Sequence, residues 1–432
     1  MTDLMTLNTL GLKQALRAIA NHECTAPEII AACYDRIEAR EPQVGAWHYN
    51  LTREQYLQLY RSNQAFYEQS PLKGLPVGIK DIIDTADMPT EMGSPIHQGR
   101  QPVDDAICVA LIRQAGGIVL GKTVTTEFAY FKPGKTANPR DLSRTPGGSS
   151  SGSAAAVADA MVPVSLGSQT AASVIRPAAY CGAVGYVGTR GTFSLRGVQP
   201  LAQSLDSLGL MARRVEDVAF MRALLLRDSD VQSGFAAQKP KRVLVAAGGL
   251  IGETDPAMQQ ALIALAERIQ AQDVEVVELD QRVRLDDMVA HHQSIMSYEV
   301  ARNLAIESAN PELLSEPLSE LIENGLNLSR DAYLRSLTVA DATAESLWQP
   351  HLDADVILAP AAPGVAPEGH GKTGAPHMSR PWQAMGLPVV NVPGMEDEQG
   401  LPLGVQLVGR RQDDDALLGY AGWLEKLMQT EA

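Results

Sequence analysis

The spacing of apolar residues predicts helices at the beginning of the chain. Apolar positions recur at helical intervals over residues 9–20 and 26–40, and Ile30 and Ile37 belong to the second set. Thr25 directly precedes that second segment, where its hydroxyl can accept a hydrogen bond from the first turn of a helix. We therefore expect the chain to open with helices.

The pattern changes after residue 73 to short apolar runs between glycines and prolines. Residues 74–80 read GLPVGIK and residues 116–122 read GGIVLGK. Runs of this length between Gly and Pro are typical of strands that are buried on both faces. Helical patterns lie between them, so we expect layers of helices around a sheet.

Residues 143–213 are unusually rich in Gly, Ser and Ala. A flexible linker has such a composition, but a linker rarely carries an apolar pattern. Here 154–164 has the pattern of a small-residue helix, and 181–186 resembles a buried turn. We therefore expect backbone segments that pack closely together.

The second half of the chain again alternates strand and helix patterns. A βαβ-like unit is expected first, then a long helix, two late strands and a closing helix. In order, these segments are 242–247, 255–272, 274–279, 285–308, 356–363, 403–409 and 413–429.

We expect a single domain over residues 1–432, because no repeat and no clean compositional boundary divides the chain. The predicted fold class is α/β, with a central mostly parallel or mixed β-sheet covered by helices on both faces. Its parts are N-terminal helices (5–60), a core with candidate catalytic residues (70–215), a βαβ and helical segment (216–350), and closing strands with a helix (351–432).

Charge and composition exclude several classes of protein. The chain has 51 acidic and 36 basic residues, a formal net charge of −15, which disfavours binding to nucleic acid. It has no signal-peptide pattern and no apolar run long enough for a membrane span. Its four cysteines form no CxxC pair, so we expect reduced thiols and a cytoplasmic location.

Several common catalytic motifs are missing from the sequence. The eight histidines form no HxH or HExxH motif, and no cluster of Cys and His has the spacing of metal ligands. The sequence also lacks a phosphate-binding GxxxxGK[ST] motif and a GxSxG motif between a strand and a helix. We therefore expect neither a metal nor a cofactor.

Three polar residues remain as candidates for catalysis. Lys80 ends the apolar run GLPVGIK, Ser149 lies in the loop GGSSS, and Ser173 lies in QTAASVIRP. Taken singly, they have ordinary interpretations as a surface lysine, a loop serine and a helix cap. A serine attacks an amide only when a base removes its proton, and a lysine becomes such a base when burial lowers its pKa.

Together these segments resemble the amidase signature family. The spacing between the two serines matches that family, as do residues 121–129, 138–158 and 380–394. The resemblance implies an amidase fold over nearly the whole chain. It also implies a relay in which Lys80 takes a proton from Ser149, held by a cis peptide, and Ser149 takes one from the nucleophile Ser173.

The resemblance also implies an oxyanion hole in the turn before the nucleophile. Its donors would be the backbone N–H groups of Thr170, Ala171, Ala172 and Ser173. The sequence departs from the family here, because Ala171-Ala172 replaces the usual Gly-Gly and Gln169 replaces the usual Asp. A turn that needs positive φ at either alanine would be strained.

Arg176 is the candidate residue for substrate binding. The segment around Ser173 looks most like the malonamidase-type branch of the family, in which an Arg at this position holds a substrate carboxylate. The alternative is that Arg176 ties the loop to acidic neighbours. A helix containing His292, Met296 and Glu299 loosely resembles a pocket-lining segment of that branch.

The sequence leaves three functions open. The main hypothesis is an amidohydrolase whose partner is a small amide, with a homodimer as a compatible assembly and no nucleic acid or membrane partner. The second is the amidase subunit of a multi-subunit amidotransferase, although the DTGGS form common in the tRNA-amidating subunit is absent. The third is an amidase-like scaffold with impaired catalysis.

Overall fold

Short apolar segments from most of the chain meet in one β-sheet. The computed structural model describes residues 4–228, 235–280 and 283–429, and within these ranges eleven strands are hydrogen-bonded in the order β1-β3-β2-β4-β6-β5-β10-β11-β9-β7-β8. The strands are β1 (Trp47–Asn50), β2 (Pro76–Lys80), β3 (Ile118–Thr123), β4 (Val164–Gln169), β5 (Val184–Val187), β6 (Ser207–Ala212), β7 (Arg242–Val245), β8 (Glu275–Glu278), β9 (Val356–Pro360), β10 (Val389–Glu396) and β11 (Pro402–Val408).

The sheet is mixed, which confirms the predicted α/β class. Parallel pairing joins β2 to β3 and β4, and it joins β7 to β8 and β9. Antiparallel pairing joins the strands between these two groups, so the sheet is not mostly parallel. The β10–β11 pair is one reason for the antiparallel share of the sheet. The connection between these two strands is short, and a short connection joins neighbouring strands only as an antiparallel pair.

Helices cover the sheet on both faces, because β4, β5 and β6 are buried at every position. On the described residues, α6 packs with α7, and α8 packs with α14. The helices are α1 (Leu12–Ala20), α2 (Ala26–Val44), α3 (Arg53–Ser62), α4 (Gln64–Gln69), α5 (Ile107–Gln114), α6 (Ser151–Ala158), α7 (Ile175–Cys181), α8 (Val215–Leu225), α9 (Pro256–Gln270), α10 (Leu285–Asn303), α11 (Glu316–Asn327), α12 (Arg330–Ser346), α13 (Arg380–Ala384) and α14 (Asp414–Gln429).

The Gly/Ser/Ala-rich region is part of the core and not a linker. Helix α6 is buried along almost its entire length, and a Cβ on Gly152 would lie 2.2 Å from the carbonyl oxygen of Ala46. Small residues are therefore needed for the backbones to approach this closely. The predicted extent of two segments was wrong: the 154–164 helix ends at Ala158, and 181–186 contains the end of α7 and the start of β5. The backbone leaves the helical conformation at Ala160, whose φ is +54°, and Pro163 further on disfavours a helix at Val162.

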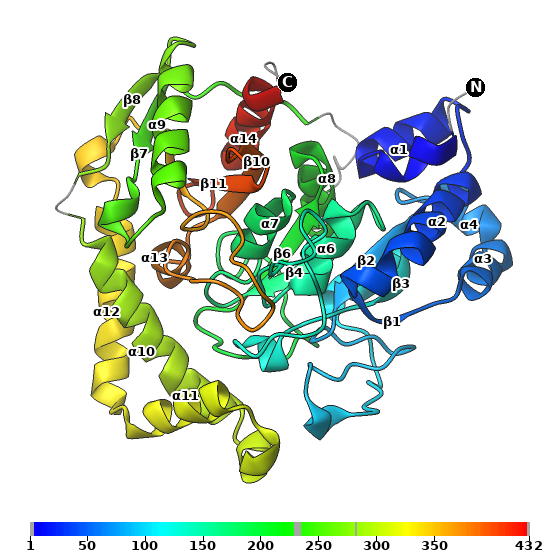
Figure 1. The fold of residues 1–432 in the computed structure, drawn as a ribbon, viewed down its shortest axis with the longest axis horizontal. Helices are drawn as coiled ribbons and strands as arrows, with labels where there is room; N and C mark the ends of the chain where they lie inside the picture. Colours follow the sequence, from blue (N-terminus) through cyan, green and yellow to red (C-terminus); the bar gives the residue numbers. More distant parts are fainter. Residues whose placement is uncertain (1–3, 229–234, 281–282, 430–432) are drawn as a thin grey trace.

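Two helices on opposite sides of Figure 1, α2 and α10, lie where the apolar patterns of the sequence predicted helices. Thr25 caps α2 as predicted, since its side chain accepts a hydrogen bond from the backbone N–H of Glu28. In Figure 1, α10, α11 and α12 extend away from the N-terminal helices, and α10 also contacts α13. The long helix predicted over 285–308 ends at Asn303. Across the described ranges, no helix combines the length and apolarity needed to cross a membrane.

The buried carboxylate of Asp414 ties α14 to the end of β5. It accepts hydrogen bonds from the Tyr186 hydroxyl and from both the backbone N–H and the hydroxyl of Thr189. Asp414→Ala leaves these donors buried without an acceptor, so we expect a loss of about 3 kcal/mol in the free energy of unfolding, measured by urea denaturation.

The neighbouring Asp415 provides the control for this prediction. Its side chain is 88% exposed and pairs with Arg222. Since exposed ion pairs contribute little, Asp415→Ala should cost less than about 1 kcal/mol. Equal losses for the two variants would contradict the role assigned to Asp414.

Candidate active site

The candidate residues lie where three neighbouring parallel strands end. Lys80 is the last residue of β2, Thr126 follows β3, and Ser173 follows β4. The carboxyl ends of parallel strands lie at the same edge of a sheet, which is where α/β proteins commonly bind ligands. Lys80 and Ser173, distant in sequence, are brought to one edge in this way.

The side chain of Lys80 is completely buried and points at two serines. Its Nζ donates hydrogen bonds to Ser149 Oγ at 2.6 Å and to Ser168 Oγ at 2.9 Å. Burial lowers the pKa of Lys80 to about 7, and only the charge of Asp206 opposes this shift. Near neutral pH the amine can therefore both lose and regain a proton.

Ser149 lies in a loop that several backbone contacts hold in place. The peptide bond between Gly148 and Ser149 is cis, and Gly147 has a φ of +80°, which glycine adopts without strain. The Thr126 N–H donates to the carbonyl oxygen of Ser149 at 3.2 Å, and the Ser150 N–H donates to that of Ser173 at 3.2 Å. The second bond connects the loop directly to the segment of Ser173.

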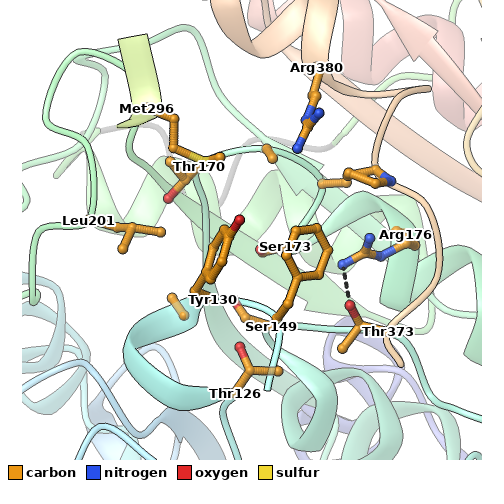
Figure 2. Close-up of a pocket in the computed structure, with 15 residues that line it drawn as sticks. Thr126, Tyr130, Ser149, Thr170, Ser173, Arg176, Leu201, Met296, Thr373 and Arg380 are labelled. Atoms are coloured by element: carbon orange, nitrogen blue, oxygen red, sulfur yellow. Dashed lines mark hydrogen bonds between the residues drawn. The ribbon is translucent and has the colours of Figure 1, made fainter. Parts of the chain in front are cut away.

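Ser149 and Ser173 line the same cavity, which Figure 2 shows. The cavity holds about 350 Å³ of empty volume, which is small for a ligand pocket. Its lining residues are Thr126, Ala129, Tyr130, Phe131, Ser149, Thr170, Ala171, Ala172, Ser173, Arg176, Leu201, Met296, Thr373, Pro376 and Arg380. The predicted site residues other than Lys80 are all in this set, and Lys80 reaches it through Ser149.

The turn before Ser173 accommodates alanine without strain. Neither Ala171 nor Ala172 has a positive φ, so the sequence change from Gly-Gly requires no unfavourable backbone. Within the described part of the chain, the N–H groups of Ala171, Ala172 and Ser173 have no hydrogen-bond acceptor. These N–H groups are therefore available to a ligand in the cavity.

Gln169 supports this turn from behind. Its Oε1 accepts hydrogen bonds from the backbone N–H groups of Val174 and Ile175, at 3.0 and 3.1 Å. Its Nε2 donates to Oε1 of Gln383 at 3.0 Å, and Gln383 donates back to the Gln169 carbonyl oxygen at 3.2 Å. A neutral amide thus caps the start of α7 without adding a negative charge beneath Ser173.

Thr170 is fixed by two buried groups: Asp206, which the sequence did not indicate, and His292, which lies in the helix that loosely resembles a pocket-lining segment. Its hydroxyl donates to Asp206, which also accepts from the backbone N–H groups of Leu201 and Ala202. Burial raises the pKa of Asp206 to about 7. The carbonyl oxygen of Thr170 lies 2.7 Å from Nε2 of His292, and burial lowers the pKa of His292 to about 3. His292 is therefore a neutral donor to this carbonyl.

Arg176 lines the cavity, but its terminal nitrogens contact protein atoms. One donates to the carbonyl oxygen of Gly374, and the other donates to that of Gly148 at 2.6 Å and to Thr373 Oγ1 at 3.1 Å. No acidic side chain accepts from it within the described residues. Its binding of a substrate carboxylate stays a prediction.

The structure adds four residues that the sequence analysis did not single out: Ser168, Asp206, Gln383 and Arg380. Arg380 and Gln383 did lie in the segment 380–394 that resembles the family, and Ser168 lies five residues before Ser173. Met296, which the resemblance suggested loosely, does line the cavity. The described residues contain no group of three or more His, Cys, Asp and Glu side chains suited to a metal ion.

Comparisons with known proteins show which family and fold the chain resembles over nearly its whole length. Residues 28–418 match the family model described as Amidase. A glutamyl-tRNA(Gln) amidotransferase chain, the A component of that enzyme in Oleidesulfovibrio alaskensis, is 31% identical over 477 aligned residues, covering 96% of each chain. A crystal structure described as an amidase superimposes with a TM-score of 0.84 at 26% identity, covering 96% of this chain and 99% of that one. A chain from a vestigial complex, described as revealing the origins of an s-triazine catabolic enzyme, gives a TM-score of 0.85 at 25% identity, with coverage of 96% and 98%.

The contacts of Arg176 predict a structural cost when it is replaced. Arg176→Gln removes the donors to the carbonyl groups of Gly148 and Gly374, so we expect the free energy of unfolding to fall by about 3 kcal/mol. Urea denaturation of the two proteins measures this loss. Arg17→Gln, which breaks an exposed pair with Glu216, should change stability by less than about 1 kcal/mol. An Arg176→Gln protein as stable as the wild type would show that these hydrogen bonds do not hold the loop.

Proposed function

Because the chain belongs to the amidase signature family, we propose that it hydrolyses the C–N bond of a small amide through an acyl-enzyme on Ser173. The observation that carries this proposal is the 2.6 Å hydrogen bond from Lys80 Nζ to Ser149 Oγ, beside a cavity that Ser149 shares with Ser173. A lysine with a pKa of about 7 in that position is suited to act as a base.

In the proposed acylation step, Ser173 Oγ attacks the amide carbon. Its proton passes to Ser149 Oγ, while the hydroxyl proton of Ser149 passes to neutral Lys80. When the tetrahedral intermediate collapses, Lys80 returns its proton through Ser149 to the leaving nitrogen, and ammonia or an amine departs. A water molecule then attacks the acyl group on Ser173 while the same relay takes its proton. The relay returns that proton to Ser173 Oγ as the ester bond breaks and the carboxylic acid leaves.

The charge on the tetrahedral intermediate needs donors that are already in place. The N–H groups of Ala171, Ala172 and Ser173, and that of Thr170 beside them, are proposed for this role. Two observations support it: the first three have no other acceptor among the described residues, and neutral Gln169 replaces a carboxylate behind the turn. Each such donor contributes on the order of 3 kcal/mol to catalysis in other hydrolases.

A second candidate function is the amidase subunit of a multi-subunit amidotransferase. The glutamyl-tRNA(Gln) amidotransferase chains that align over nearly the whole sequence favour it. Size-exclusion chromatography and an assay for ammonia release separate the two functions. A stand-alone amidase is soluble and active by itself, whereas an obligate subunit is insoluble or inactive without its partner.

The first prediction concerns the three residues of the relay. Lys80→Ala, Ser149→Ala and Ser173→Ala should each abolish ammonia release from a cleavable amide, and a double variant should be little worse than the worst single one because the residues act as a unit. Ser62→Ala, at the exposed end of α3, is the control with full activity.

A fluorophosphonate probe tests the nucleophile separately from the choice of substrate. It should label the wild type on Ser173 and leave Ser173→Ala unlabelled. Wild-type turnover by Ser173→Ala would exclude the mechanism, and an unlabelled wild-type protein would favour an amidase-like scaffold with impaired catalysis.

The second prediction concerns the pH dependence of kcat/KM. The active form requires neutral Lys80, so the rate should rise with pH through a midpoint near 7 and level off above it. At one pH unit below the midpoint, about a tenth of the lysine is neutral. EDTA should leave the rate unchanged. A profile that is flat between about pH 5.5 and 8.5, or a loss with EDTA that zinc restores, would contradict the role of Lys80.

A further inference from the structure

A second arginine, Arg380, faces the cavity without a partner. It is the first residue of α13, its exposed fraction is 6%, and it lines the cavity together with Ser173. In Figure 2 its guanidinium points into the cavity, on the side away from Ser149 and Thr126.

The guanidinium of Arg380 differs from those of buried Arg176 and partly buried Arg213. Arg213 donates to carbonyl oxygens that include those of Val162 and Asn8, and Arg176 donates to those of Gly148 and Gly374. The guanidinium of Arg380 forms no hydrogen bond or ion pair to any described residue. The Nε atoms of all three arginines have no acceptor, so the difference lies in the terminal nitrogens of Arg380. A buried cation without a partner is strongly unfavourable, so such a group indicates a missing anion.

The surroundings of Arg380 provide no negative charge. The cavity lining contains Arg176 and Arg380 and no Asp or Glu. The charged and titratable groups that face Arg380 are Tyr130, Arg176 from α7 and neutral His292 from α10. The cavity is thus positively charged, although the protein as a whole is acidic.

Two buried carboxylates behind the cavity wall, Asp206 and Glu299, already accept hydrogen bonds. Asp206 accepts from Thr170 and from two backbone N–H groups. Glu299 accepts from the backbone N–H of Ser204 at 2.8 Å and from the Tyr333 hydroxyl at 2.6 Å. Neither is available to neutralise Arg380, so the anion has to come from the ligand.

We propose that Arg380 binds a carboxylate in the acyl part of the substrate and thereby selects short carboxylate-bearing amides. The inference rests on the proposed amide hydrolysis. Ser149 must reach the leaving nitrogen to return a proton, so the leaving group lies on the Ser149 side and the acyl group extends toward Arg380. The planar guanidinium fork matches a carboxylate, and Arg176, whose terminal nitrogens hold the loop, positions the Ser149 side of the cavity.

Relative kinetics with two matched amides test the assignment. Succinamate carries a carboxylate, and butyramide is a neutral amide with the same number of carbon atoms. Arg380→Gln should lower the ratio of kcat/KM for succinamate to that for butyramide about 100-fold, because the substrate carboxylate loses its charged donor. Arg380→Lys keeps the charge without the fork and should lower the ratio about 10-fold.

Two further arginines serve as comparisons in the same assay. Arg411→Gln, outside the cavity and paired with Asp341, should leave the ratio unchanged. Arg176→Gln should reduce both rates in equal proportion. A ratio that changes in Arg176→Gln and not in the Arg380 variants would overturn the assignment. If Arg380→Gln does not fold, Arg380→Lys decides alone, and an unchanged ratio in that variant would overturn the assignment.

Direct binding separates this inference from the proposed reaction. Succinate is titrated calorimetrically into the Ser173→Ala protein, and Arg380→Gln in that background should weaken binding about 100-fold. If the wild type cleaves no amide but succinate binding depends on Arg380, the reaction is wrong and the carboxylate site stands. If amides are cleaved and neither the ratio nor succinate binding depends on Arg380, the reaction stands and the carboxylate site is wrong.

Discussion

The arrangement of the site depends on burying the amine of Lys80 beneath the Ser149 loop. A fully buried lysine is unfavourable as a cation, so burial lowers the pKa of Lys80 to about 7. Near neutral pH a large share of the amines that contact Ser149 and Ser168 is therefore uncharged. The position of this amine follows from the sheet. Strands β2 and β4 are parallel neighbours, so the end of one brings Lys80 to the place where the other leads into Ser173.

Backbone hydrogen bonds give the loops of the site a fixed geometry. The Ser149 loop is held by Thr126, by the carbonyl oxygen of Ser173 and by Arg176. The turn before Ser173 is held by Gln169, Gln383 and Asp206. Small residues make these contacts possible, because a side chain on Gly152 or Gly148 would collide with neighbouring segments. Reactive groups on loops can therefore be placed with the accuracy of a packed core.

Charge is distributed unevenly between the surface and the site. The chain has a formal charge of −15, yet its cavity contains two arginines and no acid. The groups behind Ser173 are neutral amides, a neutral histidine and a carboxylate whose pKa burial raises. An anionic intermediate or substrate in the cavity thus faces donors and cations and no exposed negative charge.

The sequence by itself determined the strand that ends at Lys80, because an apolar run between Gly and Pro predicts a buried strand whatever surrounds it. It did not predict β4, the strand that precedes Ser173. The sequence also predicted a site at Lys80, Ser149 and Ser173, since the spacing of the segments around them resembles a family. Only the tertiary structure decided the roles of Asp206, Gln383 and Arg380. The partner of each residue, or its lack of one, depends on residues far away in the chain. Burial and hydrogen bonding over such separations leave no periodic pattern in a sequence, so they become visible only when the segments are packed together.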